Sequence, residues 1–502
     1  MKINVNKIKG IFIYLAYIVF AFIIAFAFGL PEEVNLELMG ILGWGLLIIS
    51  FITWRIITGE FITAYTFYLG VLYLFFYGQS LLIPFDLVTP ERDLILRYSF
   101  INENNLFEAQ VYSFLCLASF HLGGLLFYKV NKLKDEPRLK KLGEKSISDK
   151  AILATGISLF IVSVIPYIYG MFQSLILVKM YGYSGVSRLD AQTGLNSLMG
   201  KMSLYFIPSL LCLTIAVRNS KVLRTVVQVI SGMVIFSILY IGERNDAIVF
   251  ILALVLIQHY FIRKISLKQS LKYIVSGVVL LSLLTTIADI RNMEGRTVFD
   301  YFEYMMINSF NNNFITELIS ELGSSMMPTI AIMGFVDSGE PLRNGTTYLY
   351  SLLSIVPNLG FWDLHPAAQV ASLGQWLKFR LGLSFGPGFS LAAESYLNFA
   401  WWGFFIFIFL GAFISKILGL LNKTTVKYYP AIACFVLIFF NSSLFYIRDT
   451  FLGNIRAIFY MGLPIYLLII FFNNRVERRK KEAPESKGGT YDGIIYDNYS
   501  DL

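Results

Sequence analysis

Apolar runs follow one another along most of the chain, and their length constrains its fold more than any other feature of the sequence. A helix needs about 20 consecutive apolar residues to cross a hydrocarbon core about 30 Å thick. Of the 502 residues, 56% are hydrophobic and only 15% are charged. We therefore expect an all-α, polytopic integral membrane protein with about 12 transmembrane helices. The expected spans are residues 11–30, 38–57, 61–83, 109–130, 151–172, 202–216, 226–241, 247–262, 273–290, 399–420, 430–446 and 457–472.

The lysine and arginine residues fall mainly in alternate loops, and this bias gives the expected topology. Cytoplasmic loops of membrane proteins carry an excess of these two residues. With the N-terminus inside, 28 of the 41 basic residues lie in inner segments, and both termini are cytoplasmic. The net charge of +8 follows from the same bias, so it does not indicate a nucleic acid partner.

This topology divides the chain into four parts. Residues 1–290 hold transmembrane helices 1–9, residues 291–398 form one large extracytoplasmic loop, residues 399–472 hold transmembrane helices 10–12, and residues 473–502 form a disordered cytoplasmic tail. The loop carries short amphipathic helices, because apolar residues recur at helical spacing over 301–321 and again over 348–356. Residues 326–336 are apolar but too short to span, so we expect them to be re-entrant or interfacial. The whole segment is expected to rest on the membrane surface and to cover a cavity between the helices.

The outer segments use arginine where the inner segments use lysine. Outside, arginine outnumbers lysine 10 to 3, whereas inside lysine outnumbers arginine 20 to 8. A guanidinium group binds phosphate or carboxylate through two parallel hydrogen bonds, which an ammonium group cannot do. The alternative is that these arginines anchor helices at lipid headgroups. As a set they favour an anionic ligand on the outer face, and the candidates are Arg188, Arg244, Arg291, Arg296 and Arg380.

The segment RLGLSFGPGFSLAAESYLNF, residues 380–399, places a carboxylate at the start of a late span. Glu394 and Asn398 are spaced i, i+4, so they share one face of a helix. A carboxylate at the edge of the hydrocarbon is costly unless it is paired or used. Glu394 is therefore a candidate general base, and the alternative is a structural pair with Arg380. Asn398 is a candidate sugar-binding residue.

A second candidate base lies in the sequence FWDLHPAAQ of the expected outer loop. His365 faces outward in the expected topology, and histidine is the side chain most often used as a general base near neutral pH. The alternative is a solvated loop histidine. Trp362 and Trp376 are candidates for stacking on sugar rings, and the alternative for both is a lipid anchor.

Several motifs of other chemistries are missing from the sequence. It contains no Asp-x-Asp for a metal-bound nucleotide sugar, no Walker loop and no zinc-ligand spacing. The three cysteines lie inside apolar spans, where core packing is the simplest role. We expect no cofactor and no catalytic metal.

About twelve spans, one large outer loop, the turn GERND at 242–246 and the helix start GPGFSLAAESYLNFAWWG together resemble the bacterial oligosaccharide repeat-unit polymerases of the Wzy type, which build O-antigen and capsular polysaccharide. The resemblance implies a metal-independent glycosyltransferase of the bacterial cytoplasmic membrane. Its substrate is a polyprenyl-pyrophosphate-linked oligosaccharide, which moves onto a new lipid-linked repeat unit on the outer face. The outer arginines would then bind the departing pyrophosphate, and Glu394 or His365 would activate the acceptor hydroxyl. Membrane lipid, a chain-length regulator and a flippase are the implied partners.

Three other functions fit the same architecture. A glycosyltransferase that uses a polyprenyl-phosphate sugar would place its base in the first outer loop, where Glu32 and Glu33 lie. An O-antigen ligase differs only in its acceptor. A lipid-linked oligosaccharide flippase or transporter suits twelve spans, but charged residues in the middle of the spans are few.

Overall fold

The fold is helical throughout the part of the chain that the structure describes. The computed structural model describes residues 5–27, 32–87, 103–128, 149–181, 195–265, 314–356, 358, 361–383 and 386–482, with 269, 297, 299 and 303 as isolated positions. Every regular element in these ranges is a helix. This confirms the expected all-α class.

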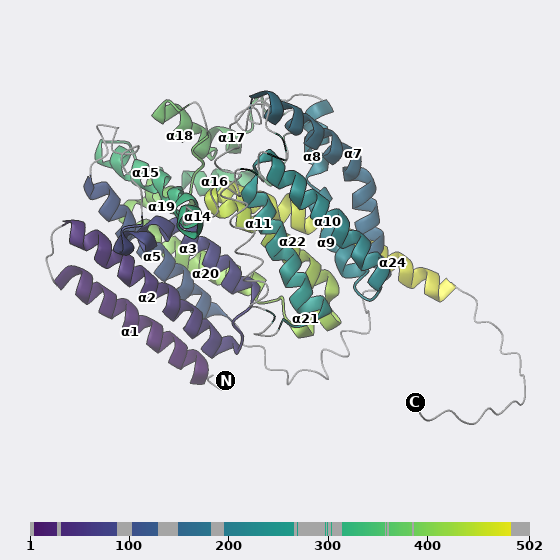
Figure 1. The fold of residues 1–502 in the computed structure, drawn as a ribbon, viewed down its shortest axis with the longest axis horizontal. Coiled ribbons are helices and arrows are strands. Elements are labelled where there is room, and N and C mark those ends of the chain that lie inside the picture. The colour runs from purple at the N-terminus through teal and green to yellow at the C-terminus, as the bar shows by residue number, and fades with distance from the viewer. Residues whose placement is uncertain are drawn as a thin grey trace, which may run out of the picture.

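The N-terminal helices form one group, in which they lie side by side (Figure 1). A later helix, α20, packs along α5 in this group. The helices of the group are α1 (Val5–Ala27), α2 (Glu32–Thr58), α3 (Ala64–Leu82), η1 (Ile83–Phe85), α5 (Glu103–Phe127), η6 (Ala400–Gly403) and α20 (Phe404–Leu418).

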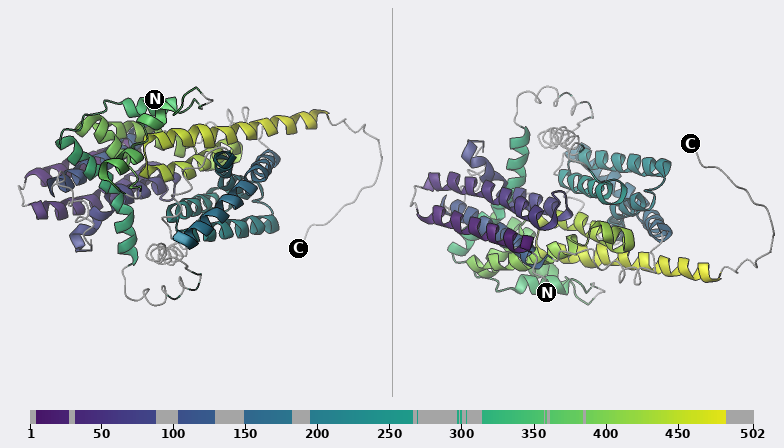
Figure 2. Two further views of the ribbon diagram at one scale, coloured as in Figure 1. Left: turned by 90° about the horizontal axis from the view of Figure 1, so that it is seen from above. Right: turned by 90° about the horizontal axis from the view of Figure 1, so that it is seen from below.

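A second group of helices lies beside the first (Figure 2). It combines the middle of the chain with its C-terminal helices, because α22 packs on α11 and α24 packs on α7. Its members are α7 (Asp149–Tyr181), α8 (Leu195–Ser203), α9 (Phe206–Ala216), α10 (Lys221–Ile241), α11 (Arg244–Ile257), η4 (Gln258–Ile262), α21 (Lys423–Tyr428), α22 (Pro430–Phe445), η7 (Tyr446–Arg448), α23 (Phe451–Arg456), η8 (Ala457–Gly462) and α24 (Leu463–Glu482).

Short helices from residues 314–399 gather at one end of the molecule. In Figure 1, α17 and α18 lie at the end of the bundle opposite the first residues of α1. The helices of this segment are α14 (Phe314–Gly323), η5 (Ser324–Met326), α15 (Met327–Asp337), α16 (Thr346–Leu353), α17 (Pro366–Val370), α18 (Leu373–Leu381) and α19 (Leu391–Phe399).

Twelve helices of the described residues are long and apolar enough to cross a membrane. Eleven of them overlap the spans expected from the sequence. The twelfth is Ile319–Asp337, which the sequence analysis placed in the outer loop, whereas the expected span 273–290 lies outside the described residues.

The stretch Ile319–Asp337 is longer than the apolar run that the sequence shows, because α14, η5 and α15 follow one another without a gap. Gly323 lies against Gly78 near the end of α3, and Asn105 at the start of α5 donates a 2.7 Å hydrogen bond to Asp337. Both contacts are with one end of the first group of helices, where α3 ends and α5 begins. The re-entrant arrangement of this stretch stays a prediction.

The end of α24 corrects one prediction. Residues 473–482 were expected to be disordered, but α24 continues to Glu482 and extends beyond the other helices (Figure 2). Asn473 Nδ2 donates to Glu477 Oε1 over 3.2 Å, and this i, i+4 pair supports the helix. Residues 483–502 lie outside the described residues.

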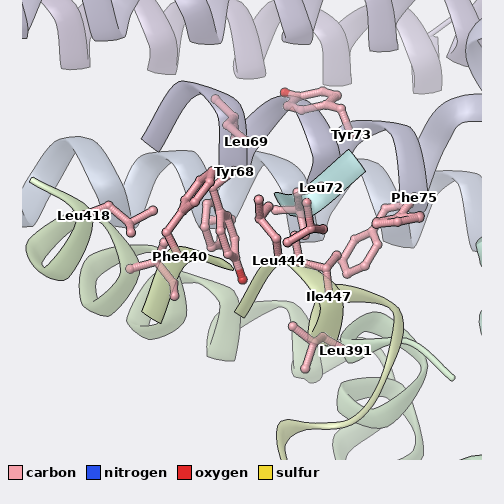
Figure 3. Packing of buried hydrophobic residues seen from close by; sticks show 14 of the residues in the cluster. Tyr68, Leu69, Leu72, Tyr73, Phe75, Leu391, Leu418, Phe440, Leu444 and Ile447 are labelled. Atoms are coloured by element: carbon pink, nitrogen blue, oxygen red, sulfur yellow. The ribbon is translucent and has the colours of Figure 1, made fainter. Parts of the chain in front are cut away.

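Helix α3 lies at the centre of the core. Its side chains meet those of α19, α20 and α22 in one buried apolar cluster (Figure 3). Through Leu391, this packing places the first turn of α19 against the same apolar cluster. The labelled members of the cluster are Tyr68, Leu69, Leu72, Tyr73, Phe75, Leu391, Leu418, Phe440, Leu444 and Ile447.

Candidate functional site

Helix α19 carries the carboxylate that the sequence singled out, and it is short and enclosed over all but its last residue. Its N-cap is Ser390, whose hydroxyl accepts a hydrogen bond from the Ala393 amide over 3.0 Å, as is usual for a helix start. The helix stops after nine residues, because Ala400 has a left-handed φ of 48°. Every residue from Leu391 to Asn398 is buried. Polar groups on this helix must therefore find partners within the protein.

Glu394 satisfies this requirement with two partners from distant parts of the chain. The Thr347 hydroxyl donates to Glu394 Oε1 over 2.8 Å, and the Phe451 amide donates to Oε2 over 2.6 Å. The side chain has no exposed surface. Glu394 thus joins α16 and α23 to α19. The alternative pairing of Glu394 with Arg380 is wrong, because Arg380 pairs with Glu340.

Asn398 lies on the same face of α19, as its i, i+4 spacing predicted. Its Nδ2 donates to Thr347 Oγ1 over 2.8 Å and to the Glu394 carbonyl over 2.7 Å, and its Oδ1 accepts from the Gly345 amide over 2.9 Å. We call Glu394, Thr347 and Asn398 the Thr347 triad. In this conformation both ends of the Asn398 amide are engaged, and its role toward sugar stays a prediction.

Two arginines converge on one carboxylate beside the Thr347 triad. Arg380 Nη2 lies 2.7 Å from Glu340 Oε2, and Arg343 Nη2 lies 3.3 Å from Glu340 Oε1. The Arg343 guanidinium also lies over the Trp376 ring, 5.7 Å from its centre. We call Glu340, Arg343 and Arg380 the Glu340 cluster. It carries one net positive charge, and Arg343 Nε is buried without a hydrogen-bond partner within the described structure.

The backbone holds the Glu340 cluster against the Thr347 triad. The Arg343 amide donates to the Leu397 carbonyl over 3.0 Å, and the Asn344 amide donates to the Asn398 carbonyl over 3.1 Å. Asn344 and Gly345 both have left-handed φ angles, 49° and 84°, which turn the chain into α16. The loop before α16 is thereby fixed on the last turn of α19.

Of the other candidate arginines, the structure describes only the backbone of one. Arg244 is the first residue of α11, two residues after Gly242, which caps the end of α10 with a left-handed φ of 105°. The GERND segment is thus a helix–helix turn, as the sequence indicated. Arg188, Arg291 and Arg296 lie outside the described residues.

His365 caps a helix with one ring nitrogen and binds a carbonyl with the other. The Ala367 amide donates to Nδ1 over 3.0 Å, and Nε2 lies 2.9 Å from the Val356 carbonyl. Because a carbonyl only accepts, Nε2 carries the proton and the ring is the neutral tautomer. Both nitrogens are occupied, so proton transfer at His365 would break one of these bonds.

The helix that His365 caps belongs to the same region as Glu394. Ala367 of α17 and Ala371 directly after it are buried against Leu452 of α23, the helix whose first amide binds Glu394. Trp362 lies beside the His365 ring, with centres 5.0 Å apart. Of the candidate sugar-binding residues, Trp376 is covered by Arg343 on one face.

Burial also shifts the pKa values of two other groups near Glu394, the Asp449 carboxyl and the Tyr348 phenol. Burial raises the pKa of the Asp449 carboxyl above its ordinary value, although the Thr450 amide and the Arg456 guanidinium act in the opposite direction. Burial, with a further contribution from Glu394, raises the pKa of the Tyr348 phenol well above its ordinary value. Tyr348 therefore stays protonated, and its ring packs 5.4 Å from that of Phe451.

The sequence analysis missed Thr347, Glu340 and Arg343 as members of the site. Arg343 belonged to the arginine-rich outer set, and that bias was the one available signal for it. Thr347 gave no signal, because a threonine in a short helix is unremarkable until its partners are known.

The fold and this site define a class: an all-α, multi-pass membrane protein with a fully buried carboxylate on α19 and a pair of arginines, one of them in a loop bonded to the last turn of the same helix. The sequence profile described as "O-antigen polysaccharide polymerase Wzy" matches residues 11–481, so the chain belongs to that family. It is accordingly a membrane protein of polysaccharide biosynthesis, with a polymerase activity of the glycosyltransferase type on lipid-linked oligosaccharides. No curated protein and no solved structure matches the chain.

Proposed function

We propose that the protein transfers a growing glycan from its polyprenyl pyrophosphate carrier to a new lipid-linked repeat unit, without a metal. The bond from the anomeric carbon to the pyrophosphate oxygen breaks, and the acceptor hydroxyl oxygen bonds to that carbon. The hydroxyl proton passes to a base, and the lipid pyrophosphate leaves. The observation that carries this proposal is the Glu340 cluster, whose surplus positive charge is held by two backbone hydrogen bonds to the last turn of α19, the helix that carries the buried Glu394.

The leaving pyrophosphate gains negative charge in this reaction, so it needs positioned cations. Arg343 and Arg380 are fixed by Glu340 and remain 36% and 53% exposed, so a diphosphate can reach them and compete with the carboxylate. Arg244 at the start of α11 is a further candidate, since a helix start favours anions. Arg188, Arg291 and Arg296 keep the same proposed role from the sequence.

Glu394 is the better of the two candidate bases. Each of its oxygens accepts one hydrogen bond and retains a second lone pair, whereas both nitrogens of His365 are fully used. Glu394 is enclosed, so the acceptor hydroxyl reaches it only after the residues around it move. Trp362 and Asn398 remain the proposed sugar contacts.

The orientation of the site belongs to the same proposal. Arg380 of the Glu340 cluster lies in α18, and α17 and α18 lie opposite the first residues of α1 (Figure 1). If both termini are cytoplasmic, as the loop charges indicate, the cluster faces outward. A chain-length regulator and a flippase would then act on the same substrate before or during polymerisation.

Purified protein in liposomes with lipid-linked repeat units tests the reaction. We expect the glycans to lengthen by whole repeats. Translocation without lengthening would indicate a flippase, and transfer to a different acceptor alone would indicate a ligase. A loss of activity in Glu33→Ala but not in the Glu340 cluster variants would support the polyprenyl-phosphate-sugar glycosyltransferase instead.

Replacing Arg380 or Arg343 with alanine is expected to reduce the polymerisation rate by about 10²-fold or more, by analogy with the loss of one oxyanion donor. Arg380→Lys should recover only part of the rate, because ammonium lacks the paired hydrogen bonds of guanidinium. Initial rates of repeat addition in liposomes provide the measurement.

Two variants separate diphosphate binding from a structural role of the cluster. Glu340→Gln removes the competing carboxylate and should preserve the rate if the arginines bind substrate. Equal losses in Glu340→Gln and Arg380→Ala would show that the ion pairs serve only the fold. Arg55→Ala is a matched control. The Arg55 guanidinium lies over the Phe61 ring, and both residues are distant in sequence from the Glu340 cluster.

A further inference from the structure

Helix α16 has its polar side turned inward and its apolar side turned outward. Thr347 and Ser351 are completely buried, and Ser354 after the helix is nearly so. On the other side, Leu349 is 68% exposed and Leu352 is 46% exposed. A helix that faces water has the reverse arrangement. The outer side of α16 therefore fits an apolar partner.

The exposed apolar surface continues to the last residue of the helix and beyond it. Leu353 and Val356 extend it, and Phe361 and Leu364 add to it from the turn before α17. None of these residues belongs to a candidate membrane span of the described structure. We call Leu349, Leu352, Leu353, Val356, Phe361 and Leu364 the α16 surface. Exposed apolar patches of this kind mark binding sites on proteins.

The start of α16 is cationic, and this suggests what kind of molecule covers its apolar side. Arg343 of the Glu340 cluster precedes the helix, and its carbonyl accepts a 2.8 Å hydrogen bond from the Thr346 hydroxyl. A molecule that pairs with these arginines and also covers the leucines needs an anionic head and a hydrocarbon tail. A lipid diphosphate has both parts.

We propose that the α16 surface binds the isoprenoid chain of the lipid-linked substrate while the Glu340 cluster binds its diphosphate. This proposal rests on the function proposed above. Eight residues of α-helix are about 12 Å long, so the surface holds only the part of the chain next to the head. Through Thr347, the helix that touches the lipid also touches Glu394. Occupation of the outer side of α16 is thereby linked to the position of the buried carboxylate.

Photo-crosslinking tests this surface without any need for turnover. A benzophenone amino acid is placed at Leu349 or Leu352, and at Ile161 of α7 or Phe236 of α10 as controls. The two controls are 66% and 58% exposed and lie in candidate spans. Liposomes contain phospholipid and polyprenyl-pyrophosphate-linked repeat units. The measurement is the ratio of polyprenyl to phospholipid adducts at each position.

We expect a higher ratio at Leu349 and Leu352 than at the controls, and a lower one when Arg380→Ala is added. Equal ratios at all four positions would show that α16 contacts the bilayer in general and would overturn the proposal. Adducts to protein alone would also overturn it. An enriched polyprenyl adduct without polymerisation would leave the lipid site standing and reject only the proposed reaction.

A kinetic test checks the same surface independently. Leu349→Asn is expected to raise the KM for the lipid-linked substrate by about ten-fold, a scale set by the transfer free energy of one leucine side chain. The kcat should change much less, because the diphosphate contacts remain. Ile161→Asn controls for the effect of a polar group at a lipid-facing position. Equal changes of KM in the two variants would contradict a specific isoprenoid site.

Discussion

Replacing Glu394 with glutamine is expected to lower polymerisation by about 10²- to 10⁴-fold, the usual contribution of a general base, while the protein still folds. The glutamine carbonyl can accept from the Phe451 amide, and its amide group can donate to Thr347 Oγ1. Only the Thr347 hydroxyl proton loses its acceptor, at a cost of about 1–3 kcal/mol of stability. Rates in liposomes and the unfolding temperature in detergent give the two measurements.

His365→Asn is the variant to compare with Glu394→Gln, because it removes the other candidate base. Asparagine caps helices well, so α17 should persist and the rate should stay near that of the unchanged protein. Activity that survives in Glu394→Gln and disappears in His365→Asn would exchange the roles of the two residues. A rate in Glu394→Gln that falls only as far as the folded fraction falls would make Glu394 purely structural.

The membrane helices were predictable because a single physical requirement sets their length. Eleven expected spans reappear in the structure, since the bilayer imposes a run of apolar residues whatever the neighbours are. The same rule failed at Ile319–Asp337. Glu321 and Ser324 interrupt the apolar run there, but the helical backbone continues through them and packs on α3.

The candidate site was predictable only as far as its geometry is local. Glu394 and Asn398 share a face because the helix period alone decides it. The partners of Glu394 are 47 and 57 residues away in the chain, and one of them is a backbone amide, which any residue type provides. The alternative pairing of Arg380 with Glu394 was wrong for the same reason. Tertiary packing, which no spacing records, places Glu340 closer to it.

The contact between α5 and α20 leads to the prediction with the largest effect on folding. A Cβ atom added to Gly123 would overlap the carbonyl of Ile408, and one added to Gly411 would overlap the carbonyl of Phe120. Small residues allow membrane helices to approach this closely. A backbone carbonyl cannot rotate away as a side chain can. Larger residues at either position therefore have to push the two helices apart.

Gly123→Val and Gly411→Val are each expected to destabilise the protein by about 3 kcal/mol or more, the upper range for overpacked cores. Gly232→Ala in α10 is the control, because nothing lies within 4 Å of its added Cβ and alanine favours a helix by up to about 1 kcal/mol. Unfolding temperatures in detergent give the comparison.

Because α19 leads through η6 into α20, separation of α20 from α5 also displaces Glu394. Polymerisation should thus be lost together with stability, and a Gly411→Val protein that stays folded and active would show that the two helices do not need to meet.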